Sequence, residues 1–320
     1  MPDGQQPCAP EPHDTGPAPN APATHSPCIG VCRLDEDTGY CLGCGRTGAE
    51  IAEWGGADDL RKAAIWQMLP ARLKTLGTKA RLLPWSPHQI GAWVAERLSA
   101  SSGSWVVGIS GAIAEFPCGP EVVVDGANAP TTVTARRPDG AFRLEVHDKL
   151  RALAFGADPA SSVVVLALPR TRVALPVRAT LTPLGPDTRA IHAEHRAMTL
   201  FDIGLGRSSF CFCVRATATS EFARKLELAA HQPWLTAFGE IGALLFDASP
   251  HRVVETALAR AEVYSPIPRP GARSPDGAHT HLLPGFLNPG SDSPSGLALP
   301  DSVTPIAIFY PASDTGHEAE

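Results

Sequence analysis

The sequence predicts an α+β protein: a small cysteine-rich metal-binding module followed by a larger domain with a mostly antiparallel sheet and a few helices. Two observations support this prediction. Four of the eight cysteines lie between residues 28 and 44. After residue 86, segments of β-type composition come first and helical segments later, without regular alternation, and this order favours an antiparallel sheet over a doubly wound parallel one.

The composition is that of an ordinary globular protein. Hydrophobic residues make up 43% of the 320 residues and charged residues 19%, which is enough apolar material for a sizeable core. The net charge of −6 gives no overall attraction to nucleic acid or to an anionic membrane. No run of 18 apolar residues occurs, so no membrane-spanning helix is expected.

The N-terminal segment 1–25 is rich in proline and lacks large apolar side chains, so we expect it to be disordered. We expect the same of residues 313–320. The N-terminus also lacks the basic start and apolar centre of a secretory signal peptide. We therefore expect a cytoplasmic protein, and in a reducing compartment clustered cysteines are more often metal ligands than disulfides.

The cysteine module spans residues 26–77 and carries two close cysteine pairs. Three residues separate Cys28 from Cys32, and two separate Cys41 from Cys44. The short loop between the pairs can bring four sulfurs to one centre, where the thiolates repel one another unless a metal binds them. Zinc uses such pairs in closed tetrahedral sites, and iron–sulfur clusters also take four cysteine ligands. The spacing predicts one metal centre and leaves the metal open.

Two helices are expected after the cysteines. Thr47 and Glu50 have the spacing of a capping box, and Asp58 is suited to cap the second helix. We expect this second helix to end at Leu69, because Pro70 disfavours helical geometry at the residue before it.

The segment 60–81 contains six basic residues and no acidic residue. Its last part overlaps residues 78–85, which are expected to form a linker. Such a segment can bind nucleic acid or simply form a solvated helix face. We favour the solvated face, because the chain is acidic overall and carries no recognised nucleic-acid motif. The basic residues are Arg61, Lys62, Arg72, Lys74, Lys79 and Arg81.

The larger domain is expected to span residues 86–312 and to begin with a helix. Ser86 suits the N-cap, Pro87 the first helical position, and Gln89 completes a capping box. Apolar residues then recur every four positions, as one buried helix face requires: Ile90, Val94 and Leu98.

Short β-type segments make up most of the rest. Pro-Asp-Gly at 138–140 predicts a hairpin between two of them, and helices are expected near 221–231 and 234–246. In the segment Phe210–Val214, aromatic and aliphatic residues alternate with Cys211 and Cys213, so the two cysteines should share one face. The predicted strands are 104–110, 121–125, 131–137, 142–147, 162–168, 172–177, 209–216, 260–265 and 304–310.

His279 and His281 form an H-x-H pair, whose side chains point the same way in an extended segment. Two neutral imidazoles suit zinc, iron, copper or nickel, so the pair is a candidate second metal site. The alternative, which we favour, is a structured loop in which His281 and Thr280 hydrogen-bond to the backbone and Pro275 and Gly277 set turns. Candidates for a further ligand are Asp276, His251, His147, His192, His195 and Glu194.

Residues 25–76 resemble a small bacterial four-cysteine domain of unknown function that is described as a predicted iron–sulfur protein. The resemblance rests on the Ser-Pro-Cys opening, the four cysteines, Gly39, Arg46-Thr47, Glu50-Ile51, Trp54 and Pro70-Ala71-Arg72. It implies metal ligation by Cys28, Cys32, Cys41 and Cys44 and favours an iron–sulfur cluster, with zinc as the alternative. Residues 86–312 more weakly resemble an uncharacterised proteobacterial family, which implies no activity.

Three functions follow as hypotheses. The first is a cytoplasmic metal-binding accessory protein, in which the cysteine module is tethered to a domain that recognises an unknown protein or small molecule. The second is a metal-dependent enzyme with an H-x-H site in the larger domain. The third is a nucleic-acid-binding zinc-knuckle protein, which the acidic composition disfavours. Neither a membrane partner nor a familiar catalytic motif is indicated.

Overall fold

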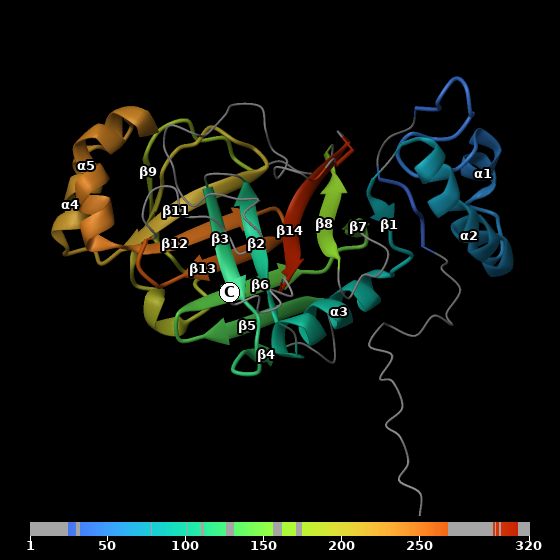
Figure 1. The fold of residues 1–320 in the computed structure, drawn as a ribbon. Coiled ribbons are helices and arrows are strands. Elements are labelled where there is room, and N and C mark those ends of the chain that lie inside the picture. Colours follow the sequence, from blue (N-terminus) through green and yellow to red (C-terminus); the bar gives the residue numbers. More distant parts are fainter. Residues whose placement is uncertain are drawn as a thin grey trace, which may run out of the picture.

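The computed structural model describes residues 25–29, 33–77, 79–100, 102–109, 112–125, 131–155, 162–170, 175–267, 297, 299–300 and 302–312. Within these ranges the chain forms two antiparallel sheets and five α-helices, so the predicted α+β class is confirmed (Figure 1). None of the helices in these ranges combines the length and the apolar character that crossing a membrane requires.

The first sheet has six strands in the order β1-β7-β8-β14-β2-β3, and every pairing in it is antiparallel. The last strand of the described chain, β14, lies between β8 and β2 and joins the two halves of the sheet. The strands are β1 (Arg81–Leu82), β7 (Arg151–Phe155), β8 (Val163–Pro169), β14 (Val303–Pro311), β2 (Gly103–Ile109) and β3 (Ala112–Pro117).

The second sheet has eight strands in the order β4-β5-β6-β13-β12-β11-β10-β9, again with antiparallel pairing throughout. The predicted hairpin at Pro-Asp-Gly is confirmed, because Arg137 of β5 pairs with Gly140 of β6. The strands are β4 (Val123–Asp125), β5 (Thr132–Arg137), β6 (Gly140–Glu145), β13 (Ala259–Val263), β12 (His251–Thr256), β11 (Phe210–Ala216), β10 (Thr199–Asp202) and β9 (Thr182–Pro186).

The main hydrophobic core lies between the two sheets and is closed by helices. Helix α3 (Pro87–Ala100) contributes Ile90, Val94 and Leu98, all with no exposed surface, and the Ser86–Gln89 capping box at its start is formed as predicted. Its Trp93 packs edge-on against Trp105 of β2 at 5.8 Å between ring centroids. Helices α4 (Glu221–Leu228) and α5 (Trp234–Ala248) bury their apolar faces in the same core.

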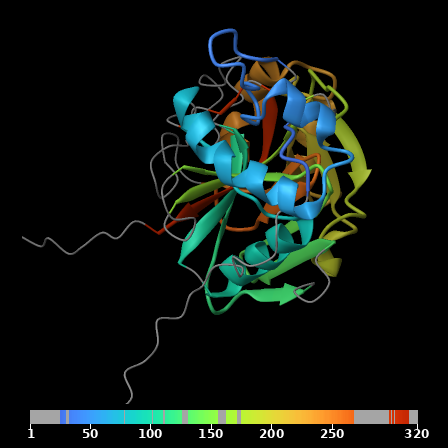
Figure 2. The same cartoon turned by 90° about the vertical axis from the view of Figure 1, so that its right-hand side faces the viewer.

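The cysteine module is joined to the six-stranded sheet through a second hydrophobic cluster. Helix α1 (Gly48–Glu53) is short, and helix α2 (Asp59–Thr75) buries four apolar side chains. Figure 2 shows these two blue helices in front of the sheet. The cluster combines side chains of α2 with side chains of β2, β7, β8 and β14: Ile65, Trp66, Leu69, Leu73, Val106, Leu153, Val165 and Ile308.

Two features of this region differ from the sequence-based expectations. Helix α2 continues through Pro70 to Thr75, so the predicted end at Leu69 is wrong. Leu69 and Leu73 are 1% and 3% exposed, and their burial on either side of the proline offsets the hydrogen bond that Pro70 cannot donate. The segment 78–85, expected to be a linker, contains β1, which pairs with β7 through Arg81↔Ala154.

Several strands were also not expected, namely β3, β7, β9, β10 and β12. Two of them carry charged residues inside apolar runs, as in Arg151–Phe155 and His251–Thr256, and so lack a simple alternating pattern. Conversely, residues 175–177 of the expected strand 172–177 do not form one. Pro176 has no N–H to donate to a neighbouring strand.

Candidate metal centre and buried polar face

Cys41 and Cys44 lie on a tight turn that holds their side chains together. The N–H of Cys41 donates to the carbonyl of Arg46 at 2.7 Å, and the N–H of Gly45 donates to the carbonyl of Cys41 at 2.8 Å. Gly45 has a φ of +74°, and a Cβ there would lie 3.3 Å from Leu73 of helix α2. Glycine at this position therefore permits both the left-handed turn and its close approach to the helix.

Hydrogen-bond donors surround the two sulfurs. The backbone N–H groups of Cys44 and Gly43 point at the Cys41 sulfur, and the Cys44 sulfur accepts from Arg46, whose Nε lies 3.4 Å away. The thiol of Cys44 also donates to Cys41, and this hydrogen bond is the main reason that the pKa of Cys41 is lowered to about 5. The same bond, together with burial, raises the pKa of Cys44. The turn thus favours negative charge on the Cys41 sulfur, as a metal-binding thiolate requires.

An ion pair and a capping box fix this turn on its helices. Thr47 accepts from the N–H of Glu50 at 3.2 Å, and the Glu50 carboxylate accepts from the N–H of Thr47 at 2.9 Å, so the predicted capping box is confirmed. Arg72 of α2 donates to Glu50 at 2.6 Å and to the carbonyl of Gly45 at 3.3 Å. Because Glu50 and Arg72 are both largely buried, the pair links the cysteine turn to α2.

The first cysteine pair is described only in part. Cys28 is half-buried, and its N–H donates to the Ser26 hydroxyl at 3.3 Å. Burial lowers the pKa of Arg151 on β7, and a thiolate at Cys28 would have a smaller and opposite effect on it. Among the described residues, the sulfurs of Cys28, Cys41 and Cys44 do not all lie within 4.8 Å of one another. Cys32 lies outside the described residues.

The H-x-H pair, His279 and His281, lies outside the described residues, as does Asp276. Of the other candidate ligands, the structure brings together His192, His195 and His251. His147 lies elsewhere, 2.8 Å from Asp148.

The three histidines surround Tyr264. The rings of His195, His251 and Tyr264 lie 4.5–4.6 Å from one another, and His192 lies 5.4 Å from Tyr264. One ring nitrogen of each histidine is buried without a hydrogen-bond partner among the described residues. The ring nitrogens of the three histidines do not all lie within 4.8 Å of one another. Among the described residues, these histidines therefore do not form a preorganised metal site.

This histidine cluster predicts an acid-sensitive fold. Burial, the neighbouring His195 and Arg215 lower the pKa of His251 to about 4, and burial and Arg215 also lower the pKa of His195. Since an unfolded histidine has a pKa near ~6.5, the unfolded chain binds more protons between about pH 6.5 and 4. The free energy of unfolding should therefore fall as the pH decreases through this window.

The measurement is denaturant unfolding at about pH 7 and about pH 5. His251→Gln should reduce the loss of stability between the two values, whereas His88→Gln, at an exposed position of α3, should leave it unchanged. An unaltered pH dependence in the His251 variant would contradict the prediction.

Beneath the histidines, a charge network is buried on the outer face of the eight-stranded sheet. The Glu262 side chain has no exposed surface, and its carboxylate accepts from Arg260 at 2.6 Å, Arg215 at 2.7 Å, Tyr264 at 2.8 Å and the N–H of Ile191 at 3.0 Å. Burial alone would raise the pKa of Glu262, but the two guanidinium groups outweigh it and hold the pKa at about 2.

Asp187 completes this network. Its carboxylate accepts from Arg215 at 3.0 Å and also pairs with Arg260. Asp187 and Ile191 belong to the segment between β9 and β10, so the network ties that segment to the sheet. Because each carboxylate is paired with guanidinium groups, we interpret the network as structural.

Sequence reasoning did not identify this network or Tyr264. The available indication was the placement of Arg215, Arg260 and Glu262 inside apolar strand segments, where an unpaired charge would be costly. The sequence does not show which of these charges meet, because Arg215 lies 28 and 47 positions from its partners Asp187 and Glu262, and Arg260 lies 73 positions from Asp187.

A third group with ligand chemistry lies beside the network. Asp202, Cys211 and Cys213 place their ligand atoms within 4.8 Å of one another on the outer face of β10 and β11. As predicted, Phe210, Phe212 and Val214 occupy the opposite, core-facing side of β11. The Cys211–Cys213 hydrogen bond and burial raise the pKa of Cys213, and burial raises the pKa of Asp202, so the surroundings disfavour negative charge on both groups.

The comparisons with known proteins agree with this two-part organisation. The model of a family of unknown function, DUF6925, matches residues 89–319, well over half of the chain. The chain belongs to DUF6925. A second model, of a protein of unknown function designated DUF1289, matches residues 26–73, which include all four cysteines of the module. This DUF6925 member has no match among curated proteins and none among solved structures.

Proposed function

We propose that this DUF6925 member is a cytoplasmic metal-binding accessory protein. In this proposal Cys28, Cys32, Cys41 and Cys44 hold one iron–sulfur cluster, and the β-sheet domain recognises a protein or small molecule. The observation that carries the metal assignment is the set of N–H donors directed at the sulfurs of Cys41 and Cys44. Such donors stabilise thiolates and tune the metal that thiolates bind.

The residues of the turn fit a thiolate-bound metal. Cys41 and Cys44 are buried, so a metal there would be shielded from bulk water on this side. Arg46 lies against the Cys44 sulfur and can offset part of the negative charge that four thiolates would bring. When bound, an iron–sulfur cluster would supply one-electron chemistry, and zinc would supply structural stability alone.

The accessory role follows from the way the module docks. Helix α2 shares a hydrophobic cluster with the six-stranded sheet, and the buried Arg151 of that sheet is electrostatically coupled to Cys28. A change of charge at the metal centre would therefore be felt by a residue of the larger domain. In the described part of the chain, the buried acids and arginines of the polar face pair with one another, which favours a binding role over a catalytic one.

Anaerobic purification followed by absorption spectroscopy and elemental analysis tests the metal assignment. We expect a coloured protein whose visible absorbance bleaches on reduction, with iron and sulfide present. Cys44→Ser should abolish the absorbance, because a hydroxyl is a poor substitute for a thiolate. Cys118→Ser, in a turn of the larger domain, is the matched control and should retain it.

Arg46→Met should leave the ligands intact but weaken metal binding by roughly 10–100-fold, as the loss of an outer hydrogen bond commonly does. A colourless anaerobic protein with stoichiometric zinc would replace the cluster with a structural zinc site. A protein without metal, from cells supplied with both iron and zinc, would contradict the proposal.

A further inference from the structure

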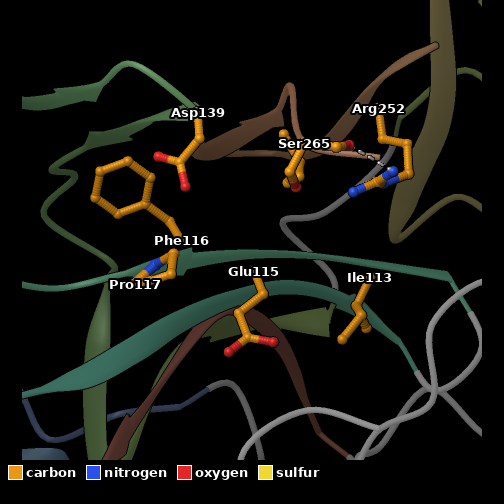
Figure 3. Close-up of a pocket in the computed structure, with 9 residues that line it drawn as sticks. Ile113, Glu115, Phe116, Pro117, Asp139, Arg252 and Ser265 are labelled. Carbon is orange, nitrogen blue, oxygen red and sulfur yellow. Dashed lines mark hydrogen bonds between the residues drawn. The ribbon is translucent and has the colours of Figure 1, made fainter. Parts of the chain in front are cut away.

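A pocket of about 250 Å³ opens where the two sheets meet. One wall is β3, the edge strand of the six-stranded sheet, and the opposite wall comes from the ends of β12 and β13. Figure 3 shows Arg252 and Asp139 on opposite sides of this pocket, with Glu115 and Ile113 on the β3 wall. This volume is small for a ligand site and suits a metabolite rather than a nucleotide cofactor.

Arg252 is the unusual residue of this pocket. It is 4% exposed, and within the described ranges its one hydrogen bond joins Nη1 to the backbone carbonyl of Ser265 at 3.3 Å. No carboxylate of the described residues lies within 4.0 Å of its guanidinium nitrogens. Burial lowers the pKa of Arg252 to about 10, so the group remains charged at neutral pH.

A comparison within the same sheet shows how unusual this is. Arg215 and Arg260 are buried to a similar degree, and each meets two or more carboxylates. A buried cation without a counter-ion destabilises the folded state, so natural proteins seldom retain one that has no function. As far as the structure describes the chain, one of the five N–H donors of Arg252 has an acceptor, and the other four can serve an anion in the pocket.

The other walls restrict what that anion can be. Phe116 and Val263, which both belong to or pack against the core between the sheets, provide apolar surface for a hydrocarbon group. Asp139 also lines the pocket, and its carboxylate would repel a ligand with two negative charges. Asp139 is paired with Arg137 at 2.9 Å, yet its carboxylate can still accept from an ammonium group.

We propose that this pocket binds an amino acid with an apolar side chain. The ligand carboxylate would pair with Arg252, its ammonium group would face Asp139, and its side chain would lie against Phe116 and Val263. A guanidinium fork matches a carboxylate in a bidentate manner, which explains why arginine suits this position. The site is separate from the cysteine turn and does not depend on a metal.

The test is calorimetric titration and thermal unfolding of the full-length protein with alanine, leucine and phenylalanine. Two leucine analogues identify the groups that matter: 4-methylpentanoate lacks the ammonium group, and isoamylamine lacks the carboxylate. We expect one of the amino acids to bind and to raise the melting temperature, and both analogues of leucine to bind more weakly than leucine. Inorganic phosphate should not compete.

Arg252→Met keeps the length of the side chain and removes its charge. We expect it to weaken amino-acid binding at least about tenfold while leaving the melting temperature unchanged or higher, because a buried unpaired charge has been removed. Arg252→Lys should weaken binding less. The control is Arg136→Met, at a position on β5 where the arginine pairs with Asp125 near the surface, and its binding should match the unaltered protein.

Three results would overturn the proposal. One is the absence of binding by all three amino acids at millimolar concentration. Another is equal binding of leucine and 4-methylpentanoate, which would remove the role of the ammonium group. The third is an Arg252→Met variant that binds as well as the unaltered protein. Loss of stability in this variant, together with no binding by the unaltered protein, would likewise show that Arg252 is a structural residue.

Discussion

Replacing Glu262 with alanine is expected to lower the free energy of unfolding by about 3–5 kcal/mol. The variant would leave Arg215 and Arg260 buried beside Asp187 and Glu255, with excess positive charge at the centre of the outer sheet face. Arg215 has no exposed surface, so water cannot replace the lost carboxylate without rearrangement of the segment that covers it. The measurement is equilibrium denaturation near neutral pH, where Glu262 is ionised.

Glu53→Ala is the matched control for this variant. Glu53 also pairs with an arginine, Arg61, at 2.7 Å, but the two side chains are 42% and 46% exposed. An exposed pair of this kind contributes about 0–1 kcal/mol. Equal effects of the two variants would show that the Glu262 network is accessible to water and would contradict the structural interpretation.

Leu69→Ala is expected to destabilise the protein by about 2–5 kcal/mol, because the side chain is 1% exposed and part of the cluster that joins α2 to the six-stranded sheet. Because the cluster contains residues of both the module and the sheet, the variant should lower the stability of the cooperative unit to which both belong. Denaturant unfolding followed by fluorescence, together with the protease sensitivity of the module, would measure this.

Leu60→Ala, on the same helix, provides the control. Leu60 is 81% exposed, so its replacement should change the free energy of unfolding by less than about 0.5 kcal/mol. If Leu69→Ala is equally mild, the module does not depend on the sheet, and the proposed coupling between the metal centre and the larger domain would lose its physical basis.

The local features of this protein could be predicted from the sequence because neighbouring residues determine them. The capping boxes at Thr47 and Ser86, the hairpin at Pro-Asp-Gly and the alternation around Cys211 all depend on residues a few positions apart, and the structure confirms each of them. The cysteine spacing belongs to the same class, since the turn from Cys41 to Arg46 is built from local hydrogen bonds.

Contacts between distant residues required the tertiary structure. Helix α2 passes through Pro70 because the sheet buries Leu69 and Leu73, and the sequence near the proline contains no sign of that sheet. The pairing of Glu262 with Arg215 and the isolation of Arg252 likewise depend on strands that are far apart in the chain. Local sequence determines backbone geometry and periodicity, whereas the cost of a buried charge depends on which distant side chain lies opposite it, and folding alone decides that.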